Sequence, residues 1–136
     1  MTSSVEREER LIKLLRKGVN LGGIAPNKFE NGHEFYKIEF CAIDAEVRLG
    51  IVLLHDKENE NGNEIPMEII QLYEIKKGKT SEITDSKLLN QKVVFQYTHA
   101  TYNTGVQHMF GKLRFPKHTT IKKETLWKES FFFYIN

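Results

Sequence analysis

Hydrophobic positions near the N-terminus recur at the period of an α-helix. Leu11 and Leu15 lie about one helical turn apart, in a segment whose other positions are mostly charged. Ser3 and Glu6 precede this stripe with the spacing of a capping box, and a glycine follows the segment. We predict an amphipathic helix over residues 4–17 that packs on its own domain or on a partner's helix.

The pattern then changes from the helical period to alternation. Residues 20–27 are rich in Gly, Asn and Pro, so we expect a loop there. Residues 35–43 and 47–53 have apolar side chains at alternate positions, which is typical of strands with one face in water. Because only a short turn at residues 44–45 separates them, we predict an antiparallel hairpin, followed by a polar loop over residues 56–64.

Residues 65–77 fit two different patterns. Pro66 is favourable at the first position of a helix, and Ile69 and Tyr73 lie one helical turn apart. The same two residues also lie on one side of an extended strand. Both a helix and a strand therefore stay open for this segment, and a polar link is expected over residues 79–85.

The C-terminal half is dense in strand-forming residues. Residues 92–102 are rich in Val, Phe, Tyr and Thr and predict a strand. A turn at residues 103–105 leads to a second strand over residues 107–115. Residues 121–135 predict a final β-rich segment.

These elements predict the α+β class, with the N-terminal helix packed on a mainly antiparallel sheet of about five to seven strands. Closure of that sheet into a small barrel is an alternative form of the same fold. The chain has 136 residues, of which 40% are hydrophobic and 28% charged. This composition suits one domain spanning residues 1–136.

The distribution of charge changes the functional picture. The first 85 residues contain 16 Asp or Glu and 12 Lys or Arg. The rest of the chain contains 2 Asp or Glu and 8 Lys or Arg. No acidic residue occurs from Ser86 to Lys123. A field of one sign on one part of a small protein attracts a partner of the opposite charge.

Aromatic residues are interleaved with these cations. Phe110, Lys112 and Arg114 alternate with apolar positions and are expected on the outer side of their strand. Because phosphates bind cations and nucleobases stack on exposed rings, we predict a small non-enzymatic protein that binds nucleic acid, single strands included. The alternative is that the rings fill the core and the lysines form a solvated face. The candidate nucleic-acid-binding residues are Lys112, Arg114, Lys117, Lys122 and Lys123 for phosphates, and Phe110, Tyr97 and Tyr102 for stacking.

Two further functional hypotheses stay open. One is a protein-interaction module, such as an inhibitor or adaptor, that uses its exposed sheet or the charged loop over residues 56–64. The other rests on two His-x-Thr triplets that begin at His99 and His118. This pattern resembles the paired triplets of the 2H phosphoesterases, and the resemblance implies two histidines that act as acid and base on a phosphodiester.

The sequence contains no signal for a cofactor, a metal or a membrane. Cys41 is the single cysteine and cannot form an internal disulfide, and no His or Cys spacing is typical of a zinc site. No run approaches the ~18–20 apolar residues of a membrane span, and the N-terminal residues lack the apolar core of a secretory signal. We expect a cytoplasmic protein without a cofactor, a metal or a membrane partner, and a homo-oligomer stays open.

Overall fold

The computed structural model describes residues 4–41 and 47–117 of the chain. Within these ranges, one helix precedes eight strands, and one 3₁₀ turn lies between two of the strands. The elements are α1 (Ser4–Lys17), β1 (Val19–Ile24), β2 (Lys28–Glu30), β3 (His33–Cys41), β4 (Val47–His55), η1 (Lys57–Asn59), β5 (Glu64–Lys76), β6 (Lys79–Ile83), β7 (Lys92–Asn103) and β8 (Val106–Arg114).

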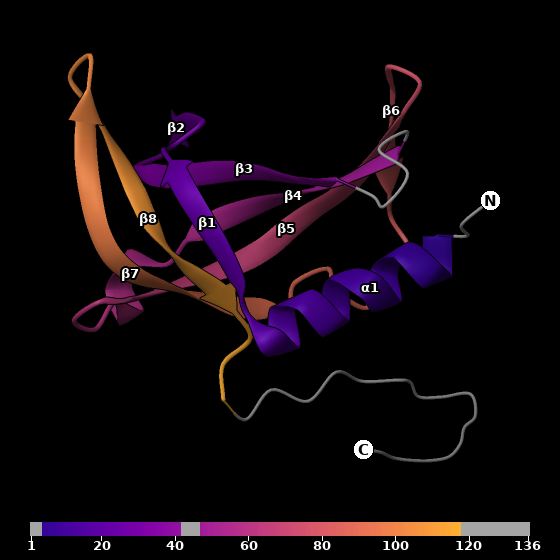
Figure 1. Ribbon diagram of the computed structural model, residues 1–136, viewed down its shortest axis with the longest axis horizontal. Helices are drawn as coiled ribbons and strands as arrows, with labels where there is room; N and C mark the ends of the chain where they lie inside the picture. The colour runs from indigo at the N-terminus through magenta and orange to yellow at the C-terminus, as the bar shows by residue number, and fades with distance from the viewer. Residues whose placement is uncertain (1–3, 42–46, 118–136) are drawn as a thin grey trace.

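All of these strands belong to one antiparallel sheet with the order β1-β8-β7-β5-β4-β3-β2, and β6 pairs with β5 beside this path. Figure 1 shows that the sheet is strongly curved and that α1 lies across one end of it. The predicted α+β class and its helix-on-sheet architecture are therefore confirmed. Within the described residues the sheet stays open, with β1 and β2 as its end strands, so it does not form the small barrel considered as an alternative.

The core lies on one side of the sheet, which we call the inner face. Side chains that are directly opposite on paired strands share a face. Tyr36 lies opposite Leu53, and Phe95 lies opposite Leu113, and all four are buried on this side. The other side of the sheet is the outer face.

Helix α1 has the predicted bounds and packs within its own domain. Leu11 and Leu15 are buried against the inner face. Glu8 is also buried, and its carboxylate accepts hydrogen bonds from the hydroxyl of Ser86 and, at 2.9 Å, from the backbone N–H of Lys87. These bonds attach the helix to the segment that precedes β7. Among the described residues, no helix combines the length and the apolar character needed to cross a membrane.

Strand β1 contradicts the prediction of a loop for residues 20–24, whereas residues 25–27 lie outside any strand as predicted. The strand pairs with β8, and its glycines suit that position. A Cβ atom built on Gly22 would lie 3.0 Å from the ring of Phe110, and Gly23, with a φ of 72°, lies where the register with β8 shifts. Glycines therefore bend this end strand and allow a ring to approach it, rather than ending it.

The open choice for residues 65–77 is decided in favour of a strand, β5. Ile65, Met67 and Ile69 alternate onto the inner face and are each at most 6% exposed. Strand β5 pairs with β4 on one side, and with β7 and then β6 on the other. These long-range pairs favour the strand because they satisfy the backbone groups of β4 and β7, which a helix here would leave without partners.

Two strands lie where the sequence pattern gave no strand. Lys79–Ile83 form β6 in the segment predicted as a polar link, and Lys28–Glu30 form β2. Lys77 and Gly78 have positive φ values of 51° and 76°, as a tight hairpin turn between β5 and β6 requires. Because nearly all side chains of these two strands are exposed, they lack the apolar alternation that identifies a strand in the sequence.

Both predicted hairpins have their expected partners. Strand β3 pairs with β4, and β7 pairs with β8. Thr104 and Gly105, with φ values of 52° and 81°, form the turn between β7 and β8. The turn predicted at residues 44–45 and the β-rich segment predicted at residues 121–135 lie outside the described residues.

Candidate functional site

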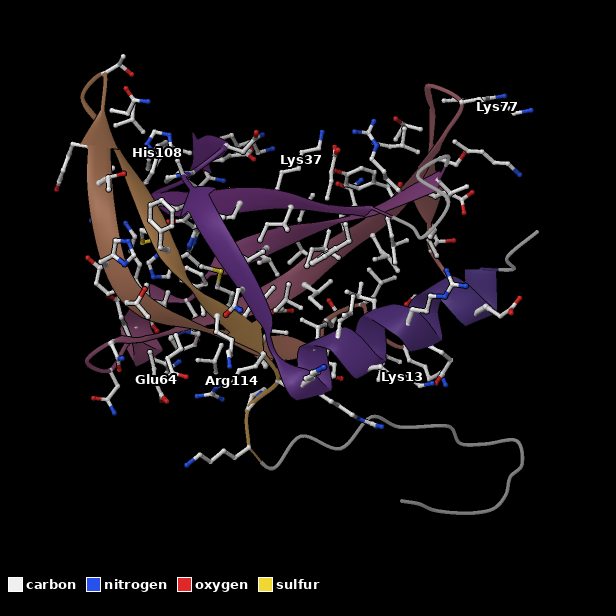
Figure 2. The ribbon with its side chains drawn as sticks, viewed as in Figure 1. Lys13, Lys37, Glu64, Lys77, His108 and Arg114 are labelled. Atoms are coloured by element: carbon white, nitrogen blue, oxygen red, sulfur yellow. The ribbon has the colours of Figure 1, made fainter. Side chains whose placement is uncertain are left out.

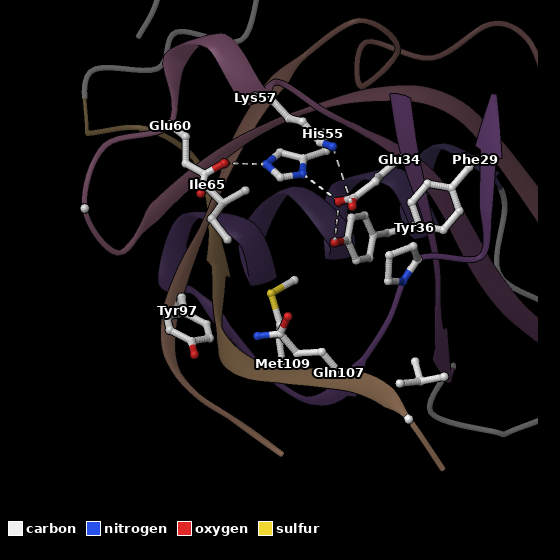
Figure 3. A pocket seen from close by; sticks show the side chains of 14 residues that line it. Phe29, Glu34, Tyr36, His55, Lys57, Glu60, Ile65, Tyr97, Gln107 and Met109 are labelled. Atoms are coloured by element: carbon white, nitrogen blue, oxygen red, sulfur yellow. Dashed lines mark hydrogen bonds and ion pairs between the residues drawn. The ribbon is translucent and has the colours of Figure 1, made fainter. Parts of the chain in front are cut away.

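A pocket of about 730 Å³ opens on the inner face, at the end of the sheet away from α1. Its lining residues come from strands and loops, with β3 and β4 on one side and the hairpin of β7 and β8 on the other (Figure 3). Tyr36, Ile65 and Met109 line the pocket and also belong to the core. The pocket is therefore a continuation of the core, and no helix among the described residues fills it.

One wall of the pocket carries a buried histidine between two glutamates. The Nδ1 atom of His55 lies 2.9 Å from Oε1 of Glu34, and its Nε2 atom lies 2.9 Å from Oε1 of Glu60. The hydroxyl of Tyr36 donates to the same oxygen of Glu34 at 3.2 Å, and Nζ of Lys57 lies 3.7 Å from the other oxygen (Figure 3). We call these five residues the His55 cluster.

The geometry of the His55 cluster requires two protons on or near the imidazole. A neutral imidazole has one N–H donor, and an ionised carboxylate only accepts. Contacts of 2.9 Å from both ring nitrogens to carboxylate oxygens therefore need either an imidazolium or one protonated glutamate. In the imidazolium form, both contacts are charge-assisted hydrogen bonds, the stronger kind.

The surroundings of Glu34 and Tyr36 shift their acid–base behaviour in opposite directions. Burial raises the pKa of Glu34, but the hydrogen bond to His55, the charge of Lys57 and the hydrogen bond from Tyr36 together bring that pKa below its usual 4.5. Burial, and then the negative charge of Glu34, raises the pKa of Tyr36. Near neutral pH, Glu34 is therefore an ionised acceptor and Tyr36 a neutral donor.

Large apolar side chains that remain exposed gather at the mouth of the pocket. Phe29 and Val106 line it and are 68% and 44% exposed. Tyr102, 73% exposed, lies directly opposite Gln107, another lining residue. In the part of the chain that the structure describes, Leu14 on α1 is the one other large apolar residue of this kind. Such a patch beside a cavity is typical of a binding site.

The predicted basic residues occupy the other side of the sheet. Phe110, Lys112 and Arg114 share the outer face of β8, as expected from their alternation with buried Leu113. The ring of Phe110 stacks on His99, with centroids 4.7 Å apart and planes 3° from parallel. Three of the eight predicted nucleic-acid-binding residues therefore lie together on one face.

Carboxylates from the first half of the chain neutralise part of this basic surface. Figure 2 shows Arg114 beside Glu64, near the C-terminal end of α1. Among residues 4–41 and 47–117, three ion pairs join the acid-poor segment to earlier residues: Arg114 with Glu64 at 2.9 Å, Lys92 with Glu68 at 3.0 Å, and Lys87 with Glu9 at 3.4 Å. The positive charge that the sequence concentrates in one segment is therefore smaller on the folded surface.

A second groove, of about 500 Å³, brings several cations together. Arg16 at the end of α1 lines it with Arg114 and the exposed Lys117, and Glu64 contributes one negative charge. The aliphatic part of the exposed Lys112 side chain lies close to the backbone just after α1. The other two predicted phosphate contacts, Lys122 and Lys123, lie outside the described residues.

The two tyrosines predicted as stacking rings lie on the opposite face from the basic residues. Tyr97 is paired with Gly111 and lines the pocket, and Tyr102 is paired with Gln107. A register shift between Tyr97 and His99 reverses the alternation of β7, which places both tyrosines on the inner face. Strand β7 does pair with β8 as predicted, but its tyrosines belong to the pocket side.

No protein-family model, curated protein or solved structure matches this chain. Its function has to be inferred from the chemistry of its own residues.

The His-x-Thr hypothesis lacks a described pair of histidines. His99 is exposed on the outer face and stacks on Phe110, while His118 lies outside the described residues. Within residues 4–41 and 47–117, no group of three or more His, Cys, Asp or Glu side chains has the arrangement of a metal site. The paired-histidine mechanism stays a prediction.

Sequence reasoning missed the His55 cluster because its members come from separate elements. Glu34 is on β3, His55 ends β4, and Glu60 lies in the polar segment before β5. The sequence carried one weak signal of the cluster. The apolar side of the alternating strands also includes Glu34, Tyr36 and His55. Polar side chains in such positions need partners.

Proposed function

We propose that this protein binds a small, largely apolar molecule in the pocket at the uncovered end of the inner face. The observation that carries the proposal is the exposure of Phe29 and Val106 at the mouth of a cavity of about 730 Å³. A ligand between them removes both side chains from water, and each Å² of apolar surface so buried contributes roughly 25 cal/mol.

The interior of the pocket supports the same function. Ile65 and Met109 provide an apolar floor, and Tyr97 adds an aromatic wall. Met is unbranched and adapts to irregular apolar surfaces. Polar groups are confined largely to the His55 cluster and Gln107, so the pocket combines an apolar body with a few groups that orient a ligand, as small-molecule sites do.

The test is a titration with Nile red, a neutral dye whose fluorescence rises in apolar surroundings. We expect saturable binding to the parent protein and a loss of about tenfold or more in affinity for Val106→Asp, which places a charge in the mouth. The matched control is Leu14→Asp, because Leu14 and Val106 are 43% and 44% exposed. Equal losses in the two variants, or no saturable binding by the parent, would contradict the proposal.

A second candidate function is nucleic-acid binding by the outer face. The observation that favours it is the shared position of Phe110, Lys112 and Arg114 on β8, beside the groove lined by Arg16 and Lys117. Four cations near one stacked ring suit a phosphate backbone, and affinity for it falls steeply with salt. The interaction-module hypothesis also stays a prediction.

Binding to labelled single-stranded and duplex oligonucleotides at two salt concentrations tests this second candidate. We expect salt-sensitive binding that Lys112→Glu combined with Lys117→Glu abolishes. Arg114 is left in place because a glutamate there would face Glu64. Lys77→Glu is the control, since Lys77 lies in the β5–β6 turn, far from Arg114 (Figure 2). Binding that is absent, or lost equally in the control, removes this candidate.

A further inference from the structure

The two glutamates of the His55 cluster differ in how firmly they are held. The side chain of Glu34 is 20% exposed and has three partners, namely Tyr36, His55 and Lys57. The side chain of Glu60 is 42% exposed and contacts Nε2 of His55. Glu34 therefore orients the imidazole from within, and Glu60 covers its second nitrogen from the solvent side.

Glu60 is also placed where its side chain can leave without disturbing the sheet. It follows η1 in the connection between β4 and β5, and its backbone is extended, with a φ of −67° and a ψ of 134°. The neighbouring backbone is held independently, because Asn61 and Glu64 exchange two hydrogen bonds of 3.0 and 3.1 Å. Rotation of one exposed side chain is enough to free Nε2 of His55 toward the pocket.

We propose that the ligand of this pocket is an apolar carboxylic acid whose carboxylate replaces that of Glu60 on His55, beside Lys57. The proposal rests on the proposed function and deepens it by naming the head group. Glu60 already shows that a carboxylate fits against Nε2 at 2.9 Å, and Lys57 on η1 lines the same pocket. The apolar tail then lies between Tyr97, Met109 and Val106.

Charge balance distinguishes this head group from the alternatives. With an imidazolium, the cluster has two positive groups, His55 and Lys57, and two negative groups, Glu34 and Glu60. A ligand carboxylate that replaces Glu60 keeps this balance inside the pocket. An ammonium group in the place of the Glu60 carboxylate sets donors against the Nε2 donor, and an alcohol offers only a neutral acceptor to a charged donor, which gives a weaker bond.

The experiment compares octanoate, 1-octanol and octylamine, which share one tail, as competitors that displace Nile red at neutral pH. We expect octanoate to displace the dye at a concentration about tenfold lower than the other two. Glu60→Gln removes the protein's own carboxylate that competes for His55, and it should strengthen the binding of octanoate about threefold or more. It should have little effect on the binding of octanol. Lys57→Gln should weaken the binding of octanoate by a similar factor.

Glu58→Gln is the matched control, because Glu58 is exposed in the same η1 segment and the change removes the same charge. If Glu58→Gln strengthens the binding of octanoate as much as Glu60→Gln does, the effect comes from the general negative charge of the segment. The proposal that the ligand replaces Glu60 on His55 is then overturned. If the three competitors are equally effective, the head-group assignment is wrong and the proposed function stands. If Nile red itself does not bind, both proposals are wrong.

Discussion

The two ends of the curved sheet differ in what covers their inner face. At one end, Leu11 and Leu15 on α1, and Leu88 in the segment before β7, are at most 2% exposed. At the other end, Phe29 and Val106 line a pocket and are 68% and 44% exposed. In the part of the chain that the structure describes, one continuous sheet therefore has a filled end and an unfilled end.

This difference separates stability from function. Apolar side chains at the filled end lower the free energy of the folded state because they are removed from water. At the unfilled end, exposed apolar side chains contribute little stability and are available to a ligand. Substitutions at the filled end should therefore change unfolding, and substitutions at the unfilled end should change binding.

The largest effect is expected at the filled end. Leu15→Ala removes a fully buried side chain from α1 and should lower the free energy of unfolding by about 2–5 kcal/mol. Leu14→Ala, on the exposed side of the same helix, should change it by no more than about 0.5 kcal/mol. Urea denaturation measures both. Similar losses in the two variants would mean that α1 does not bury one face as described.

An intermediate effect is expected in the polar wall of the pocket. His55→Ala leaves the buried side of Glu34 without its closest partner and should cost about 1–3 kcal/mol of unfolding free energy. His33→Ala, an exposed histidine at the start of β3, should cost no more than about 0.5 kcal/mol. The same denaturation experiment compares the two, and a His55 variant as stable as the His33 variant would contradict the described network.

The dependence of stability on pH sharpens the role of Glu34. Its pKa is below 4.5 in the folded protein, so the unfolded chain binds the proton more tightly. The resulting stabilisation is fully present above the unfolded pKa and is lost as the pH falls through the folded pKa. Denaturation between about pH 6 and pH 3 should show a smaller loss of stability in Glu34→Gln than in the parent. Glu58→Gln should retain the parent's slope, and equal slopes in all three proteins would count against the assigned interactions.

The smallest effect on stability is expected at the mouth of the pocket. Phe29→Ser should change the free energy of unfolding by no more than about 0.5 kcal/mol, because the ring is already largely in water. The same variant should bind Nile red at least about threefold more weakly. A variant that loses stability but keeps its affinity for the dye would reverse the assigned roles of the two ends.

Local patterns in the sequence were sufficient for much of the fold. The helix over residues 4–17 and the two hairpins are encoded by periodicity and by short turns, which act over a few residues. Residues 65–77 were left open because Ile69 and Tyr73 suit both periods. Only pairing with distant strands decides that β5 is extended.

The candidate site was less accessible from the sequence. Simple alternation puts Tyr97 and Tyr102 on opposite faces, and the register shift in β7 puts both on the inner face. Alternation along residues 107–115 gave the correct outward position of Lys112 and Arg114, but nothing local shows that Glu64 neutralises Arg114 across the sheet. The pocket depends on how β3, β4 and the β7–β8 hairpin meet, which is a property of the tertiary fold.

The most direct test of the central claim is NMR spectroscopy of the protein with labelled methionine and leucine methyl groups, titrated with 1-octanol. Met109 lines the pocket, and Leu15 is fully buried on the side of α1 that packs on the inner face. We expect the Met109 resonance to shift in a saturable manner while the Leu15 resonances stay in place. A Met109 resonance that does not move, or that moves only together with Leu15, would show that the unfilled end is not a ligand pocket.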